Sequence, residues 1–272
     1  MKIKFACADF TFPLLTHDQA LSVISALDIR GVDIGLFQNR SHLQPATEFR
    51  NVRRAARRLK RRLDDNGLVA ADVFLQLALD YESRALNHPA PRRRRLAREA
   101  FERALDYTSE CAARHLTTLP GVRFAGESRR DSLDRAADEL AWRVEQACKY
   151  RICFAIEPHV GSFADSPKRA LQLVQRVPGL TLTLDYGHHY PRGYSEADLE
   201  TLIPHSSHHH VRGFNRRSGA TPLAQNRVDF KRMLRGMKKA GYRGWIELEY
   251  GDNNITDTVE LRDHLHRLAS SL

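Results

Sequence analysis

Short apolar runs and longer amphipathic stretches alternate along the whole chain. Strand-like apolar runs stand at IKFACA, GVDIGL, LVAADVFL, HLTTLP, ICFAIE, LTLTLD, HHHVRGF and WIELEY. Stretches with helical spacing lie near residues 17–27, 48–64, 92–113, 131–149, 166–177, 195–202, 227–240 and 256–270. A period of two residues is typical of strands, and a period of about 3.6 residues is typical of helices. The pattern therefore predicts eight strands that alternate with eight helices.

This alternation favours an α/β fold of the (β/α)8 TIM-barrel type. Strands that alternate with helices build parallel sheets, and a TIM barrel consists of eight such units. An open, doubly wound sheet is the alternative. No G-x-G-x-x-G follows the first strand-like run, which argues against a dinucleotide-binding sheet. Because neither a composition break nor a low-complexity linker divides the chain, we expect residues 1–272 to form a single TIM-barrel domain.

The run TLTLD at residues 181–185 has the alternation of polar and apolar side chains that is typical of a barrel strand. Its threonines and leucines alternate, and it ends on Asp185. One face of a barrel strand packs against the outer helices, and the other faces the lumen. Leu182 and Leu184 should then face the helices, while Asp185 faces the lumen at the carboxyl-terminal rim, where the active sites of this fold lie.

Three other strand-like runs carry polar side chains at the same end. Glu157 ends the fifth run, His210 lies on one face of the seventh, and Glu249 lies near the end of the eighth. Four consecutive strands thus deliver an acid or a histidine to one rim. Two more residues share these faces one layer deeper: His208, which we expect to be a core histidine, and Glu247, which would be a buried acid.

Such a set of side chains predicts a metal ion. Carboxylates that converge in a confined space raise one another's pKa, and a divalent cation compensates their charge. Three carboxylates and one imidazole suit a hard or borderline ion. We expect one divalent metal ion, with Mn²⁺ favoured and Mg²⁺, Co²⁺ or Zn²⁺ as alternatives.

Four segments resemble the signatures of one barrel superfamily: IEPHVGSF, LTLDYGHH, HHHVRGFN and WIELEYG. This is the xylose-isomerase-like superfamily of sugar phosphate isomerases/epimerases, ketose 3-epimerases, hydroxypyruvate isomerases and zinc AP endonucleases. The segments LDYESRALNHP and TTLPG resemble its third and fourth strand regions, so the resemblance spans most of the chain. Its most specific part is the D-x-x-H of Asp185 and His188 together with the closing L-E-Y. The similarity is closest to proteins described as sugar phosphate isomerase/epimerase.

The resemblance implies roles for individual residues. It places substrate oxygens against His188 and assigns substrate binding to Arg216. The acid that the family carries in the loop after the fifth strand is Phe163 here, so the chain departs from a simple ketohexose epimerase. Carried over position by position, the metal ligands of the family fall on Glu157, Asp185, His210 and Glu249.

The chemistry of such a site can be stated from its groups. A metal that chelates a ketone and its neighbouring hydroxyl acidifies the carbon-bound proton and stabilises the enediolate. One carboxylate can take this proton and a second can return it, and we expect Glu157 and Glu249 to be that pair. Return to the adjacent carbon is isomerisation, and return to the opposite face is epimerisation. His159, two residues after Glu157, and His42, after the second strand, are further candidates for substrate contacts.

Three other functions fit parts of the pattern. A lyase, such as a dehydratase or a C-glycoside-cleaving enzyme, would begin with the same proton abstraction. An AP-endonuclease-like nuclease needs a D-x-H after the seventh strand, but NRVDFKR has no histidine after Asp229. A non-catalytic binding barrel would have no need of converging acids.

Charge adds one feature, because the formal net charge is +10. The basic runs at residues 53–62 and 92–95 fall in helical patterns, so we expect solvated outer helix faces. A nucleic-acid footprint is the alternative. We expect a small-molecule carbohydrate as partner and disfavour nucleic acid, while the sequence leaves a homo-oligomer open.

The remaining composition points to a cytoplasmic protein. No segment approaches the roughly 18 apolar residues of a membrane span. The start MKIKFACADFTFP has no apolar core and no cleavage site of a signal peptide. The cysteines Cys7, Cys111, Cys148 and Cys153 form no C-x-x-C pair, and we expect them to be small core residues.

Overall fold

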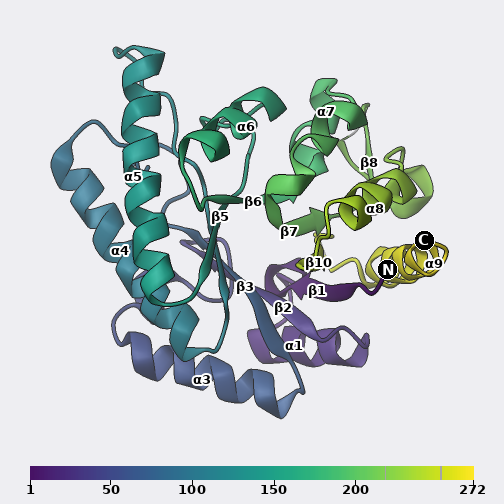
Figure 1. The fold of residues 1–272 in the computed structure, drawn as a ribbon. Coiled ribbons are helices and arrows are strands. Elements are labelled where there is room, and N and C mark those ends of the chain that lie inside the picture. The colour runs from purple at the N-terminus through teal and green to yellow at the C-terminus, as the bar shows by residue number, and fades with distance from the viewer. Residues whose placement is uncertain (218, 252) are drawn as a thin grey trace.

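The computed structural model describes residues 1–217, 219–251 and 253–272. In this part of the chain, parallel strands close into a barrel in the order β1-β10-β7-β6-β5-β4-β3-β2 (Figure 1). The prediction of a (β/α)8 barrel is confirmed. The barrel strands are β1 (Lys4–Ala8), β2 (Gly31–Phe37), β3 (Val69–Gln76), β4 (His115–Thr118), β5 (Cys153–Ile156), β6 (Thr181–Asp185), β7 (Ser206–Val211) and β10 (Trp245–Leu248).

Helices surround the barrel on its outside (Figure 1). Two short strands, β8 (Phe214–Asn215) and β9 (Gly219–Ala220), pair antiparallel in the segment that follows β7. The helices are α1 (His17–Ala26), α2 (Pro45–Glu48), α3 (Val52–Asp65), α4 (Pro91–Glu110), α5 (Arg129–Lys149), α6 (Pro167–Arg176), α7 (Glu196–Glu200), α8 (Phe230–Lys239) and α9 (Ile255–Ser270).

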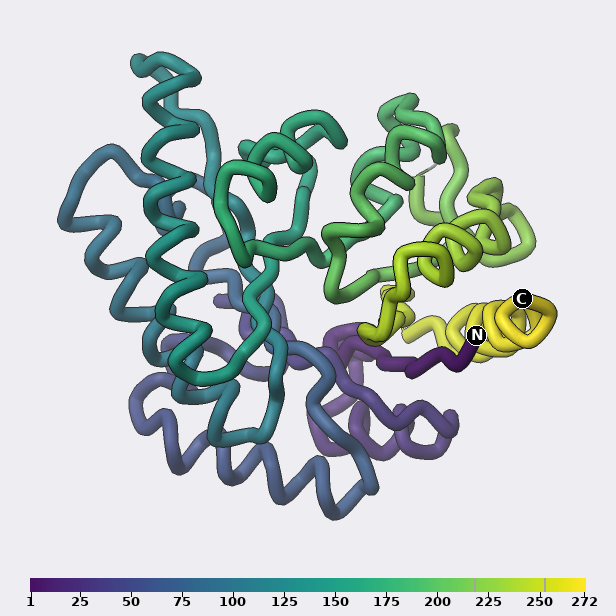
Figure 2. Tube along the Cα trace, in the orientation of Figure 1, coloured from purple at the N-terminus to yellow at the C-terminus, as the bar shows by residue number. Residues whose placement is uncertain are grey.

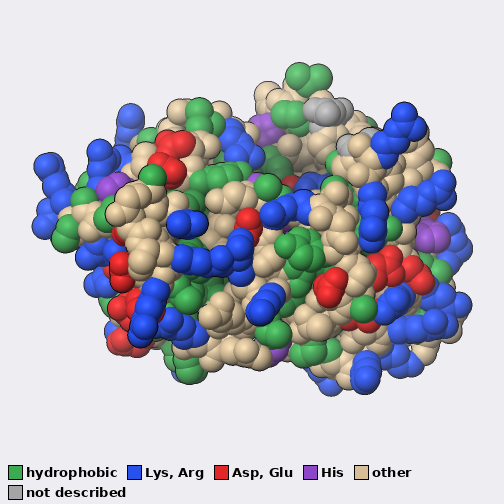
Figure 3. Space-filling model, turned by 90° about the horizontal axis from the view of Figure 1, so that it is seen from above, with side chains coloured by type: hydrophobic (Ala, Val, Ile, Leu, Met, Phe, Trp, Pro, Cys, Tyr) green, Lys and Arg blue, Asp and Glu red, His purple; other side chains and the backbone are tan. Residues whose placement is uncertain are grey.

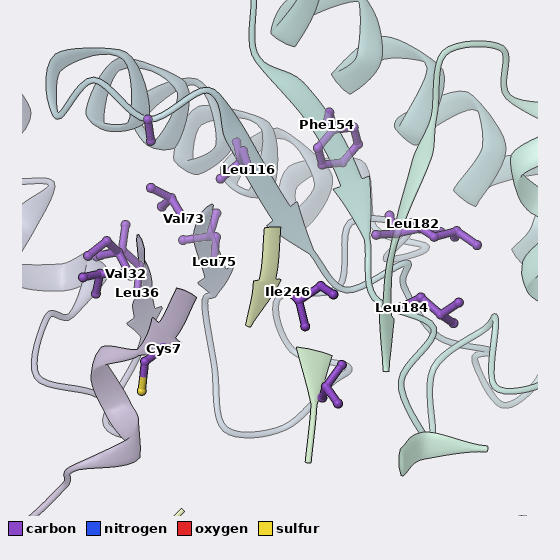
Figure 4. Close-up of a cluster of buried hydrophobic side chains, with 14 of the residues drawn as sticks. Cys7, Val32, Leu36, Val73, Leu75, Leu116, Phe154, Leu182, Leu184 and Ile246 are labelled. Atoms are coloured by element: carbon purple, nitrogen blue, oxygen red, sulfur yellow. The ribbon is translucent and has the colours of Figure 1, made fainter. Parts of the chain in front are cut away.

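An apolar layer between strands and helices holds the barrel together. Leu182 and Leu184 of β6 are fully buried on the helix side, as their alternation with threonine predicts. Figure 4 shows these leucines in one cluster with apolar side chains from other strands, such as Phe154. Each fully buried aliphatic side chain contributes about 1.5–3 kcal/mol relative to an exposed one. Because this layer supplies the apolar core, the side chains that face the lumen can be polar.

The basic run of α3 lies on its outer face, as predicted. Ala56, Leu59 and Leu63 are buried against the barrel, whereas Arg54 and Arg61 are exposed. Other basic residues of this run pair with acids, as Arg57 does with Glu110, Arg58 with Glu48 and Lys60 with Asp64. Figure 3 shows Lys and Arg side chains spread over one face of the molecule with Asp and Glu among them. The charge is therefore dispersed over that face.

The helix ends follow local capping chemistry. The Thr16 and Asn51 side chains cap α1 and α3 by accepting backbone hydrogen bonds from the first helical turn. Ser166 occupies the N-cap position before Pro167 as expected, but among the described residues its side chain makes no capping hydrogen bond. The termini lie side by side, because the amino group of Met1 donates to the Ala269 carbonyl at 2.8 Å (Figure 2).

Two expectations about bulk properties can be compared with the structure. Among the described helices, none combines the length and the apolar character that a bilayer crossing requires. The expectation that all four cysteines are core residues is wrong for two of them. Cys7 and Cys111 are buried, but Cys148 and Cys153 are exposed. Cys148 lies near the end of α5, and Cys153 is the first residue of β5, where the barrel opens to solvent.

Candidate active site at the carboxyl-terminal rim

Strand ends bring the four predicted ligands to one rim of the barrel. Glu157 follows β5, Asp185 ends β6, His210 lies near the end of β7, and Glu249 follows β10. His210 is in register with Asp185 on one side and with Glu247 on the other. Glu157, Asp185 and His210 are at most 3% exposed, and the Glu249 side chain is 20% exposed. The rim thus holds three carboxylates that are largely withdrawn from water.

Three of the four side chains converge on one point. His210 Nδ1 lies 3.1 Å from Glu157 Oε1 and 3.4 Å from Glu249 Oε2. One ligand atom from each of Glu157, His210 and Glu249 lies within 4.8 Å of the others. Ligand atoms this close together could share one divalent ion at ordinary bond lengths of about 2.0–2.6 Å.

Asp185 lies beside this group but is bound differently. Its Oδ1 accepts a hydrogen bond from the Gly187 backbone at 2.7 Å, and its Oδ2 accepts one from Arg212 at 2.9 Å. His188 links it to Glu157, because His188 Nε2 lies 3.5 Å from both Asp185 Oδ2 and Glu157 Oε1. Asp185 can become a fourth ligand only if its contact with Arg212 is rearranged.

Arg212 also reaches the site, although it was not among the residues predicted from the sequence. Its guanidinium donates to Asp185 Oδ2 and lies 2.8 Å from Glu249 Oε2, so it bridges two predicted ligands. Burial opposes its charge, but the Glu249 and Asp185 carboxylates outweigh burial and raise the pKa of Arg212. A signal was present in the sequence, because Arg212 continues the alternation of His208 and His210 along one face.

His188 and His159 form the outer wall of the site. Their ring centroids are 3.9 Å apart, and one ligand atom of each lies within 4.8 Å of a Glu157 oxygen. Burial opposes protonation of His188, but Glu157 and Asp185 outweigh it and raise its pKa. Burial lowers the pKa of His159, whose Nδ1 lies 3.2 Å from the Tyr81 hydroxyl. The structure thus brings both histidines to the predicted site.

His42 and Arg216 lie in other surroundings. The His42 ring stacks on His17 at 5.3 Å between centroids, and His17 in turn lies 3.0 Å from Asp9. The exposed Arg216 side chain lies over the Tyr190 ring, with its guanidinium carbon 5.2 Å from the ring centroid. Within the described residues, Arg212 and not Arg216 is the arginine that contacts the rim acids.

Comparison with known proteins agrees with this fold. The family described as xylose isomerase-like TIM barrel matches residues 21–269. This chain belongs to that family. Its barrel superposes on a D-tagatose 3-epimerase-like protein with a TM-score of 0.78 and 20% identity, covering 99% of this chain and 98% of the other.

Two further proteins resemble this xylose isomerase-like barrel, one over nearly the whole chain and one over about half of it. The probable 3-DHS dehydratase AsbF of Bacillus anthracis superposes with a TM-score of 0.73 and 15% identity, covering 97% of this chain and 99% of that one. The uncharacterized protein MJ1188 of Methanocaldococcus jannaschii is 27% identical over 145 residues, 52% of this chain. This alignment spans only about half of that relative, 53% of its length. Likeness at this level shows a shared fold, and fold does not determine the reaction.

The donor set of this xylose isomerase-like barrel fits a divalent metal ion. Burial opposes ionisation of Glu157 and Glu249, but charged neighbours outweigh it. His188 and His210 hold the pKa of Glu157 well below its usual range, and Arg212 lowers the pKa of Glu249 to about 2. Both carboxylates are therefore ionised at neutral pH, in the form that binds a cation. Mixed carboxylate and imidazole donors suit Mn²⁺ and similar ions.

Proposed function

We propose that this protein is a cytoplasmic, divalent-metal-dependent isomerase or epimerase that acts on a sugar, a ketose or a sugar phosphate. The observation that carries the proposal is the placement of Glu157 and Glu249 on either side of His210 Nδ1, at 3.1 and 3.4 Å. With two ionised carboxylates this close together, an ion bound between them would hold a substrate within reach of both.

In this proposal, Glu157, Asp185, His210 and Glu249 hold one ion, with Mn²⁺ favoured. When bound, such an ion polarises the substrate carbonyl and stabilises the negative charge that develops on its oxygens. Arg212 holds Asp185 and Glu249 in place and offsets their repulsion. Glu157, His210 and Glu249 therefore need little reorganisation when the ion arrives, whereas Asp185 must rearrange its contact with Arg212.

Glu157 and Glu249 are the proposed proton-transfer pair. One of them abstracts the proton from the carbon beside the carbonyl, and the other returns a proton to that carbon or to its neighbour. His188 donates a hydrogen bond to a substrate oxygen as negative charge grows on it. His159 contacts the substrate from the same wall. Arg216 and His42 are proposed as further substrate contacts at the mouth of the barrel.

A lyase on the same site is the second candidate. Dehydration of a hydroxy-carbonyl compound also begins with abstraction of a proton beside the carbonyl. The likeness to the probable dehydratase AsbF over nearly the whole chain supports this alternative. The two reactions differ only after the proton is removed. A lyase then expels a leaving group, whereas an isomerase or epimerase returns a proton and keeps the substituent.

The proposal is tested with metal-loaded protein and a substrate panel. We would incubate Mn²⁺-loaded protein with ketoses, ketose phosphates and hydroxy-keto acids, and follow the products by NMR in deuterated water. We expect a stereoisomer or an aldose with deuterium at the reacting carbon, and no product from Asp185→Ala. An unsaturated product would establish the lyase instead. Turnover that Asp185→Ala leaves at the wild-type rate would overturn the assignment of the site.

A further inference from the structure

A second cluster of metal-ligating side chains lies in the lumen one layer below the rim. Asp33 of β2, Asp72 of β3, and His208 and His210 of β7 each offer one ligand atom within 4.8 Å of the others. All four residues are at most 3% exposed. The fully buried Glu247 adjoins them, with its Oε2 3.9 Å from His210 Nε2. We call these five residues the deep cluster.

The described residues satisfy only some of the polar atoms of the deep cluster. Asp72 Oδ1 lies 2.6 Å from His115 Nδ1, but its Oδ2 has no hydrogen-bond partner among the described residues. Asp33 Oδ2 lies 2.5 Å from His208 Nε2, while its Oδ1 is likewise unpartnered. Within the same part of the chain, neither oxygen of Glu247 has a partner. A buried polar group without a partner costs about 1–3 kcal/mol, and more when it is charged.

The strand register concentrates negative charge at this level. Asp33 and Asp72 are directly in register on neighbouring strands, just after a register shift at Val32. A second register shift precedes the pair of Thr183 and His208 on β6 and β7. Such bulges re-aim side chains and are frequent beside functional sites.

Some of the neighbours of the deep cluster in the strand register are small side chains. Ala6 lies in register with Glu247, and Thr183 lies in register with His208. The Thr117 and Thr183 hydroxyls are 2.7 Å apart. Bulky branched residues usually fill the lumen of a TIM barrel at such levels. Here polar atoms take their place, which suits an ion better than an apolar core.

We propose that the deep cluster is a second cation site, distinct from the rim site, with Asp33, Asp72, His208 and His210 as ligands of a borderline divalent ion such as Zn²⁺. Two carboxylates and two imidazoles match the donor types of a closed, four-coordinate zinc site. Full burial makes this site structural, because the surrounding side chains leave no open position for a substrate. Glu247 adds negative charge next to the ion.

His210 connects the deep site to the rim. Its Nδ1 faces Glu157 and Glu249, whereas its Nε2 faces Asp33 and Glu247. An ion on the Nε2 side would fix the orientation of the ring and thereby the position of Nδ1 at the rim. With an ion at each nitrogen, His210 would be a bridging imidazolate, and its ring proton would be released as metal binds. The rival explanation is that a proton on Glu247 neutralises the cluster without any ion, because burial raises the pKa of Glu247.

Metal content distinguishes these possibilities. Purified protein comprising residues 1–272 is loaded with Zn²⁺ alone, dialysed, and analysed by mass spectrometry for zinc per folded chain. We expect wild type to hold a rim ion and a deep ion. Asp185→Ala should lose the rim ion, and Asp72→Asn should lose the deep ion. Asp9→Asn is the matched control, because Asp9 is also buried beside a histidine but lies outside both groups, and it should keep the wild-type content.

Each other result has a separate meaning. If folded Asp72→Asn keeps the wild-type zinc content, the deep site is refuted, whatever becomes of the rim. If Asp185→Ala keeps the wild-type content and Asp72→Asn loses zinc, the rim proposal fails and the deep site stands.

If Asp72→Asn does not fold, anomalous diffraction at the zinc edge tests the deep site instead. A peak between β2, β3 and β7 in a crystal of zinc-loaded wild type would support the deep site. Its absence there would overturn the proposal.

Discussion

His210 Nδ1 lies 3.1 Å from Glu157 Oε1, which joins two barrel strands that are not neighbours. Between β5 and β7 stands β6, whose Asp185 is in register with His210. The imidazole therefore draws the acid from β5 toward Glu249 at the end of β10. Two carboxylates on either side of one ring nitrogen can serve a single substrate carbon.

The first prediction follows from this placement. Replacing Glu157 or Glu249 by Gln keeps an oxygen but removes the base, so turnover should fall by about 10²–10⁴-fold. Exchange of the substrate's carbon-bound proton in deuterated water separates the two roles. A variant that still exchanges this proton without forming product has kept the abstracting base and lost the returning acid. If both Gln variants turn over at the wild-type rate, other groups transfer the proton, and His188 and His159 become the next candidates.

A second prediction concerns Cys153, an exposed residue whose thiol sulfur lies 3.5 Å from the Thr181 hydroxyl and is partly buried. Burial opposes its ionisation, but His115 outweighs burial and lowers the pKa of Cys153 from 9.0 to about 7. Since the thiolate is the nucleophile, alkylation by iodoacetamide should rise through pH 7 and level off above it. Mass spectrometry of the labelled peptides at a series of pH values measures this midpoint, with the exposed Cys148 as internal reference.

A substitution of His115 tests the cause of this lowered pKa in the same experiment. His115→Gln removes the cationic partner, so the midpoint for Cys153 should move to higher pH. An unchanged midpoint in that variant would show that His115 does not set the reactivity of the thiol.

A third prediction concerns a buried ion pair within α5, Arg143 with Glu139, which Arg98 of α4 also contacts. Arg143 is 2% exposed and donates to Glu139 Oε2 at 2.9 Å, while Arg98 donates to the same carboxylate from α4. Glu139→Ala leaves the Arg143 charge buried without its partner, which should lower the free energy of unfolding by about 3–5 kcal/mol. Urea denaturation followed by circular dichroism measures the loss.

The matched control is Glu145→Ala on the same helix. Glu145 pairs with Lys149 at 3.0 Å, but both side chains are more than half exposed. Exposed pairs contribute about 0–1 kcal/mol, so this variant should unfold almost as wild type does. Equal losses in the two variants would contradict the special role of burial at Glu139.

A fourth prediction addresses the basic face of α3. Changing the exposed Arg54, Arg57 and Arg61 to Gln removes charge without touching the buried side of the helix. Turnover of the small substrate should stay within about twofold of wild type, because surface charges at this distance are screened by salt. DNA binding with a steep salt dependence that the triple variant loses would instead favour a nucleic-acid partner.

The sequence by itself determined the barrel and the rim. Alternation of apolar and polar residues is a local property, and it was enough to place the strands and helices. Parallel strands of a barrel end at one rim, so Glu157, Asp185, His210 and Glu249 could be expected together before any distance was known. The same local logic placed Glu247 one layer below Glu249, where the structure finds it buried.

Only the tertiary structure decided which side chains meet inside and around the barrel. Arg212, not Arg216, reaches Asp185 and Glu249, because that contact depends on the path of the chain after β7. Asp33 and Asp72 approach His208 through barrel closure and register shifts that no local pattern encodes. Periodicity depends on neighbouring residues, whereas these distances join strands far apart in sequence and arise only when the sheet closes.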